Sequence, residues 1–114
     1  MRAFAIAALI AGACGAVAIS SGPALAAGDV KAGRQKALQC QTCHGLDGQA
    51  KLPEAPNLAG QTEVYLGKAL KDYRSGARRN DMMSVIAHAL SDQDIDNLAA
   101  YYAAIPVTVG APPK

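Results

Sequence analysis

Residues Cys40-Gln41-Thr42-Cys43-His44 form a C-x-x-C-H motif, which is the most specific pattern in the chain. Two thiols and an imidazole in this order are typical of covalent haem attachment. The thiols can reach the two vinyl groups on one porphyrin edge as thioethers, and the adjacent histidine then lies under the iron as its ligand. The motif therefore predicts one haem c, with its iron, bound by Cys40, Cys43 and His44.

Two other interpretations of a C-x-x-C pair are less favoured here. A structural zinc site takes four nitrogen or sulfur ligands, and Cys14 is the only other cysteine in the chain. A thioredoxin-like redox pair is expected beside a βαβ pattern, and the sequence lacks such a pattern. Haem attachment remains the favoured interpretation.

The first part of the chain has the features of a secretory signal peptide, residues 1–26. Arg2 precedes an apolar run over residues 3–19, and Ala24-Leu25-Ala26 forms an A-x-A cleavage site. We expect cleavage after Ala26, which leaves one small domain of residues 27–114 in the periplasm and discards Cys14. A retained membrane anchor is the alternative, but the apolar run is short and is broken at residues 22–23, so no permanent anchor is expected.

Composition limits what residues 27–114 can do. A domain of this size has a modest core and commonly depends on a metal, a disulfide or a cofactor for its stability. This part of the chain has no Trp and no Phe, so few large side chains are available to pack against each other. The formal net charge of the whole chain is +2, and it approaches neutrality without Arg2, so nucleic-acid binding is not indicated.

The hydrophobic pattern after Ala27 predicts helices joined by Gly/Pro loops, and hence an all-α fold. Asp29 is a candidate N-cap for a helix from 30 to about 38. Residues 45–60 contain too many Pro and Gly residues for a regular element. Thr62 can cap a second helix that stops at Gly76. Its apolar stripe is Leu66, Ala69, Leu70 and Tyr73.

The C-terminal part predicts a loop from 77 to about 83, a short apolar segment over 85–90, and a last helix. Ser91 is an N-cap candidate, and acids follow it in the first turn, where the helix dipole favours negative charge. Pro106 ends this helix. Its apolar stripe is Ile95, Leu98, Ala99 and Tyr102.

These segments together resemble class I cytochromes c, most of all the small bacterial cytochrome c-553 and cytochrome c4-like domains. The resemblance rests on residues 28–33 before the C-x-x-C-H motif, Ala55-Pro56-Asn57-Leu58-Ala59-Gly60 after it, and residues 90–95 with 98–102 at the end. It spans essentially all of residues 27–114. The chain has one motif where dihaem cytochrome c4 has two, so it resembles a single monohaem unit.

The resemblance implies a cytochrome c fold in which Gly33 crosses the last helix near Tyr101. It further implies that Leu98 and Tyr102 face the porphyrin and that the Pro56 carbonyl accepts a hydrogen bond from His44.

The sixth ligand of the iron has three candidates, Met82, Met83 and His88. A thioether opposite a histidine raises the reduction potential relative to two histidines. The resemblance to cytochrome c4, in which the ligand lies seven residues before the leucine of L-S-D-x-D, selects Met83 relative to Leu90. Met82 is the alternative, and His88 is interpreted as a surface histidine.

Two occupied axial positions indicate an electron carrier and not an enzyme, because the iron then has no open site for a substrate. The expected partners are membrane or periplasmic oxidoreductases, including a terminal oxidase. Two alternatives stay open: a cytochrome subunit of a periplasmic oxidoreductase complex, and an open-site haem enzyme or sensor.

A basic stripe of Lys68, Lys71 and Arg74 is expected on the second helix, and Arg78 and Arg79 extend it. The acids at 92, 94 and 96 are expected to cluster elsewhere, which would make the protein a dipole. We therefore expect the stripe to steer docking to an acidic redox partner.

Overall fold

The computed structural model describes residues 27–114, and the expected signal peptide, residues 1–26, lies outside the described residues. The described part is helical and contains no strand, which confirms the all-α prediction. Its elements in chain order are α1 (Val30–Lys36), the 3-10 helix η1 (Ala37–Gln39), α2 (Gln41–His44), α3 (Glu63–Ser75), α4 (Asp81–His88) and α5 (Asp92–Ala103).

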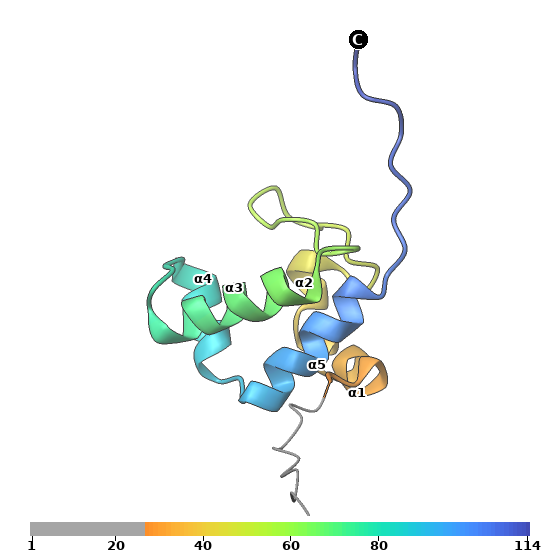
Figure 1. Cartoon of the computed structure of the whole chain (residues 1–114). Coiled ribbons are helices and arrows are strands. Elements are labelled where there is room, and N and C mark those ends of the chain that lie inside the picture. Colours follow the sequence, from red (N-terminus) through yellow and green to blue (C-terminus); the bar gives the residue numbers. More distant parts are fainter. Residues whose placement is uncertain (1–26) are drawn as a thin grey trace, which may run out of the picture.

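The first and last helices cross, and this crossing brings α1 and α5 into contact (Figure 1). Asp29 caps α1 by accepting a hydrogen bond from the backbone N–H of Ala32. Gly33 is buried at the crossing, where a Cβ atom would lie 2.7 Å from the Cβ of Tyr101. The helices therefore meet at the point that the resemblance implies.

Helix α3 begins and ends where the sequence predicts. The Thr62 side chain accepts from the backbone N–H of Tyr65, and Gly76 stops the helix with a φ of 82°. A left-handed residue after the last turn is a common helix end, and glycine adopts this conformation without a steric penalty. Helix α3 packs against both α5 and α4.

Helix α4 begins earlier than the sequence predicted, and this corrects the expected loop. The side chain of Asn80 accepts hydrogen bonds from the backbone N–H groups of Met82 and Met83. Both methionines therefore lie in the first turn of a helix and not in a loop. The signal was present as Asn80-Asp81, a capping residue followed by an acid at the positive end of the helix dipole.

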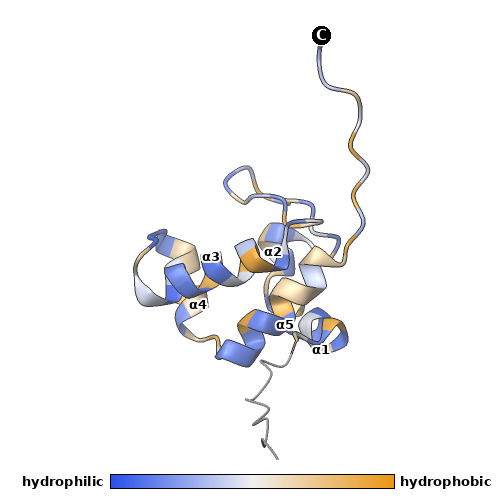
Figure 2. Ribbon diagram, viewed as in Figure 1, coloured by the Kyte–Doolittle hydropathy of each residue, from blue (hydrophilic) through white to orange (hydrophobic). Residues whose placement is uncertain are grey.

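Helix α5 supplies most of the hydrophobic core. A capping box joins Ser91 and Asp94 at its start, where each side chain accepts from the backbone of the other residue. Ile95 is fully buried and Leu98 is 2% exposed. Figure 2 shows a hydrophilic first turn and a largely hydrophobic second half in this helix. The second half therefore forms the inner wall against which the other helices pack.

Candidate haem-binding site

A cavity that is partly open to solvent lies between α2, α3, α4 and α5. Its walls are mainly aliphatic and aromatic. The lining residues that the sequence pointed to are Cys40, His44, Pro56, Met83, Leu98 and Tyr102.

His44 is buried at the end of α2 and is held by one hydrogen bond. Its Nδ1 atom lies 2.9 Å from the carbonyl oxygen of Pro56. A carbonyl only accepts, so Nδ1 carries the hydrogen and Nε2 keeps its lone pair. This tautomer leaves Nε2 free to bind a metal, and a carbonyl partner of this kind usually fixes the orientation of a ligating histidine.

The two cysteines of the motif are half-buried free thiols. Burial raises the pKa of Cys40 to about 11. A redox-active or metal-binding cysteine usually has a lowered pKa, because the thiolate is the reactive form. The raised value therefore argues against a thioredoxin-like pair. In the described residues, 27–114, no three His, Cys, Asp or Glu side chains converge on a common point, so a zinc site finds no second pair of ligands there.

Of the three candidates for the sixth ligand, only Met83 lines the cavity. It is half-buried, whereas the side chain of Met82, its neighbour in the helix, is 63% exposed. His88 is exposed at the last turn of α4. The first turn of α4 thus turns one thioether toward the cavity that His44 lines and the other toward solvent.

Leu98 and Tyr102 form part of the α5 wall of the cavity, four residues apart on the same helix face. Both are almost fully buried. Burial also raises the pKa of Tyr102, so its phenol stays protonated and can act as a hydrogen-bond donor.

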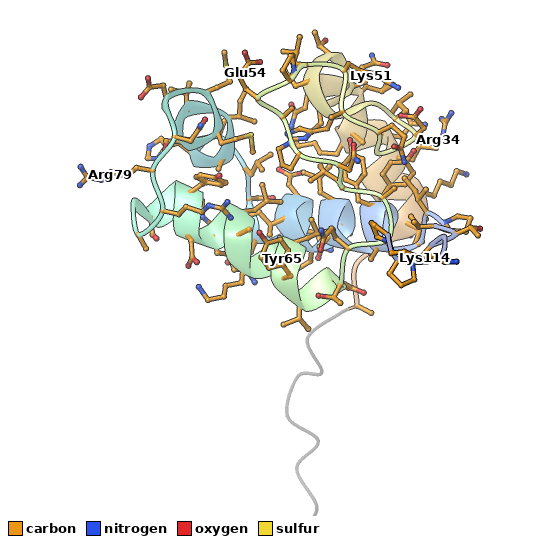
Figure 3. All side chains as sticks on the ribbon, turned by 90° about the horizontal axis from the view of Figure 1, so that it is seen from above. Arg34, Lys51, Glu54, Tyr65, Arg79 and Lys114 are labelled. Carbon is orange, nitrogen blue, oxygen red and sulfur yellow. The ribbon has the colours of Figure 1, made fainter. Side chains whose placement is uncertain are left out.

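Arg78 supplies a positive charge to a cavity that is otherwise mostly apolar. Its guanidinium lies 4.7 Å from the centre of the Tyr73 ring, and one of its nitrogens donates to the Tyr65 hydroxyl at 3.4 Å. The sequence pattern did not predict Arg78, Tyr73 and Tyr65 as cavity residues. Arg78 in particular looked like an extension of the basic stripe on the protein surface. Its neighbour Arg79 points away from the body of the protein (Figure 3).

This set of residues suits a haem. The aliphatic and aromatic walls suit the flat macrocycle, and a guanidinium suits one of its two carboxylates. An imidazole nitrogen and a thioether sulfur are the usual axial pair of a carrier haem. The side chain of Cys40 lines the cavity, and Cys43, three positions further along the chain, is half-buried.

The basic stripe of α3 is corrected by the structure, because the acids expected elsewhere lie beside it. Each of its three cations has a carboxylate partner: Lys68 with Asp72, Lys71 with Asp96 and Arg74 with Asp92. Arg74 also donates to the carbonyl oxygen of Leu90 at 3.0 Å. The stripe is thus neutralised locally, and the expected separation into a basic and an acidic region is wrong.

The fold and the cavity are those of a c-type cytochrome, and the family model for cytochrome c matches residues 30–104. The chain belongs to the cytochrome c family, whose members carry covalently bound haem c.

Similar proteins refine this placement. The chain is 46% identical over 90 residues to cytochrome c4 of Pseudomonas aeruginosa, which covers 79% of this chain and 45% of that protein. It is 47% identical over 79 residues to cytochrome c-554(548) of Halomonas halodenitrificans, covering 67% of this chain and 95% of that protein. The crystal structure of reduced cytochrome c4 from Pseudomonas stutzeri superposes with a TM-score of 0.67 at 40% identity, covering 74% of this chain and 49% of that one.

The chain spans about half the length of the cytochrome c4 proteins that it matches. It spans nearly all of the Halomonas relative. Within residues 27–114, none of the helices is both long enough and apolar enough to cross a membrane.

Proposed function

We propose that the protein is a periplasmic electron carrier that transfers one electron at a time through a single haem c. Cys40 and Cys43 would hold the haem as thioethers, and His44 and Met83 would bind its iron from opposite sides. The observation that carries this proposal is that His44 and Met83 line the same cavity. The Nδ1 atom of His44 is already used by Pro56, so Nε2 is the nitrogen available to the iron.

The bound haem would supply a one-electron iron couple, and the chain would set its potential. Met83 offers a soft, neutral sulfur that favours ferrous iron. Leu98 and Tyr102 keep water from one wall of the cavity. The guanidinium of Arg78 would balance the negative charge of one haem carboxylate. With both axial positions taken, the protein would move electrons without transforming a substrate.

The periplasmic location rests on the N-terminal segment of the sequence. Residues 1–26 combine a charged start, an apolar run and an A-x-A site, which is the pattern of a cleaved export signal.

The redox partners would be oxidoreductases of the same compartment. Docking through Lys68, Lys71 and Arg74 remains a prediction, and their ion pairs weaken it because each positive charge is balanced by a nearby carboxylate. A paired charge attracts a distant partner less than a free one does. Arg79 is a cation for which no carboxylate lies within ion-pair distance among the described residues, and it lies close in sequence to Met83.

A second function, that of a cytochrome subunit in a larger oxidoreductase complex, has one observation in its favour. The structure of thiosulfate dehydrogenase (TsdBA) from Marichromatium purpuratum contains a part similar to this chain, with a TM-score of 0.65 at 31% identity, covering 73% of this chain and 20% of that one. Size-exclusion chromatography of the protein from its native cells would separate a free monomer from a stable complex.

An optical spectrum in both oxidation states, with a pyridine haemochrome assay, tests the main proposal. We expect two thioether bonds, a low-spin spectrum and a sulfur-to-iron charge-transfer band in the oxidised form. We also expect the reduced protein to resist carbon monoxide. Rapid carbon monoxide binding would instead favour the open-site enzyme or sensor, and the absence of covalent haem would refute the proposal.

A further inference from the structure

Two consecutive tyrosines near the end of α5 donate to two consecutive carbonyl groups that follow His44. The Tyr102 hydroxyl donates to the carbonyl oxygen of Gly45 at 3.1 Å, and the Tyr101 hydroxyl donates to that of Leu46 at 2.7 Å. Tyr102 is 3% exposed and Tyr101 is 9% exposed, so water competes little for either hydroxyl. The backbone directly after His44 is thus fixed by α5.

Tyr102 also holds the other end of the loop that begins there. We call residues 45–60, between α2 and α3, the proximal loop. The backbone N–H of Gly60 donates to the backbone carbonyl oxygen of Tyr102 at 3.0 Å. Tyr102 therefore contacts the first residue of the proximal loop through its hydroxyl and the last through its backbone. Gly45 and Gly60 have φ values of 71° and 68°, a region that glycine enters readily.

The proximal loop carries the carbonyl group that accepts from His44. Pro56 lies within it, and the loop is tied back to the C-x-x-C-H turn by a 2.8 Å hydrogen bond from the Lys51 N–H to the Cys43 carbonyl oxygen. The distance between Pro56 and His44 thus depends on where the two ends of the loop are held. Tyr102 holds both ends, and Tyr101 reinforces the first.

We propose that Tyr101 and Tyr102 are positioning residues that set the His44–Pro56 hydrogen bond, and through it the electron donation of His44 to the iron. The argument rests on the proposed function, in which His44 is an iron ligand. A hydrogen bond to the second ring nitrogen of a ligating histidine raises its basicity, and a more basic ligand stabilises ferric iron. The alternative is that the two hydroxyls only satisfy buried carbonyls, in which case their loss affects stability alone.

The test is Tyr102→Phe in the haem-loaded protein, because phenylalanine keeps the ring and removes only the hydroxyl. We expect the reduction potential to rise and the NMR signal of the His44 ring N–H to move. Exchange of that N–H with solvent should accelerate about tenfold, the usual order for loss of one buried hydrogen bond. Tyr101→Phe should act in the same direction but less strongly, since Leu46 is one residue further from His44.

Ile95→Val is the matched control. Ile95 lies in the same helix, is fully buried and is not a cavity-lining residue, so its truncation lowers stability without touching the proximal loop. If both tyrosine variants lower the melting temperature but match Ile95→Val in potential and in His44 N–H exchange, the positioning role is wrong. If Tyr102→Phe yields no folded holoprotein, the reduction potential and His44 N–H exchange of Tyr101→Phe are compared with those of Ile95→Val, and this comparison decides whether the positioning role holds. A wild-type protein without a His/Met low-spin spectrum would refute the proposed function instead.

Discussion

Gly33 of α1 and Asn97 of α5 meet so closely that no side chain fits between the two helices. A Cβ atom on Gly33 would lie 2.0 Å from the carbonyl oxygen of Asn97, well inside van der Waals contact. The Asn97 side chain also accepts from the backbone N–H of Asp29 at 2.8 Å, which fixes the start of α1 on the same helix. The crossing of the first and last helices thus depends on a glycine and an asparagine.

Gly33→Ala should therefore separate α1 from α5 and destabilise the holoprotein by about 1–3 kcal/mol, as expected for overpacking of a tight contact. Gly67→Ala in α3 is the matched control, because its Cβ would meet nothing within 4 Å. Helix propensity alone predicts about 1 kcal/mol of stabilisation for that control. Chemical denaturation of both variants checks the contrast, and equal effects would mean that the crossing tolerates a side chain.

Haem attachment should build the fold. Ile95 is the only large side chain among the described residues that is less than 2% exposed, so the apolar core without haem is small. Ordering the chain costs about 1–2 kcal/mol per residue in backbone entropy, which so small a core offsets poorly. We expect Cys40→Ala and Cys43→Ala to lower covalent haem and secreted yield, and His44→Ala to abolish the low-spin spectrum. An apoprotein of the double cysteine variant that melts like the holoprotein would contradict this.

Met83→Ala should lower the reduction potential and open the iron to carbon monoxide, because the thioether that favours ferrous iron is lost. Met82→Ala is the control, since its side chain is mostly exposed and points away from the cavity wall. The charge-transfer band of the oxidised protein should vanish only in the first variant. Its loss in Met82→Ala alone would reverse the assignment, and its survival in both would exclude either methionine as the single ligand.

Arg78→Gln should lower the reduction potential, because a positive charge beside the haem disfavours the extra positive charge of ferric iron. Arg79→Gln removes the same charge from a side chain that points away from the body of the protein (Figure 3), so its effect should be smaller. Spectroelectrochemical titration of the two variants gives the comparison. Equal shifts would mean that only net charge matters and that Arg78 has no special position.

Docking charges can be tested by removing a whole ion pair. The double variant Lys71→Gln/Asp96→Asn leaves the net charge unchanged, so we expect its rate with ferricyanide to keep the wild-type dependence on ionic strength. Arg79→Gln removes a cation without a carboxylate partner and should slow this anionic oxidant at low salt. A clearly slower double variant would show that Lys71 contacts the oxidant directly. That result would support the predicted docking role of the basic stripe.

The elements that could be predicted from the sequence were those with local signals. The caps at Asp29, Thr62 and Ser91 and the stop at Gly76 act within a few residues, so the pattern alone identified them. Helix α4 starts before the predicted apolar segment because Asn80 caps it within the expected loop. The choice of Met83 over Met82 came from its spacing to Leu90 in the family resemblance. Helical periodicity did not distinguish the two methionines.

Contacts between distant segments were beyond the reach of the sequence. Lys71 and Asp96 are 25 positions apart and become partners only when α3 packs on α5. The Arg78–Tyr65 contact and the two tyrosine hydrogen bonds to residues 45 and 46 likewise depend on tertiary packing. Helical periodicity indicates which face is apolar, but it does not indicate which helix covers that face.

The crossing of α1 and α5 also has a consequence for the order of events while the chain folds. The hydrogen bond from Asp29 to Asn97 joins residues 68 positions apart, so α1 has no partner until the last helix has emerged. Such long-range contacts form late, because the intervening chain must first be closed into a loop. Cys40 and Cys43 lie between the two helices and are thus accessible in the incomplete chain. We therefore expect both thiols to be open to haem attachment before α5 packs on α1.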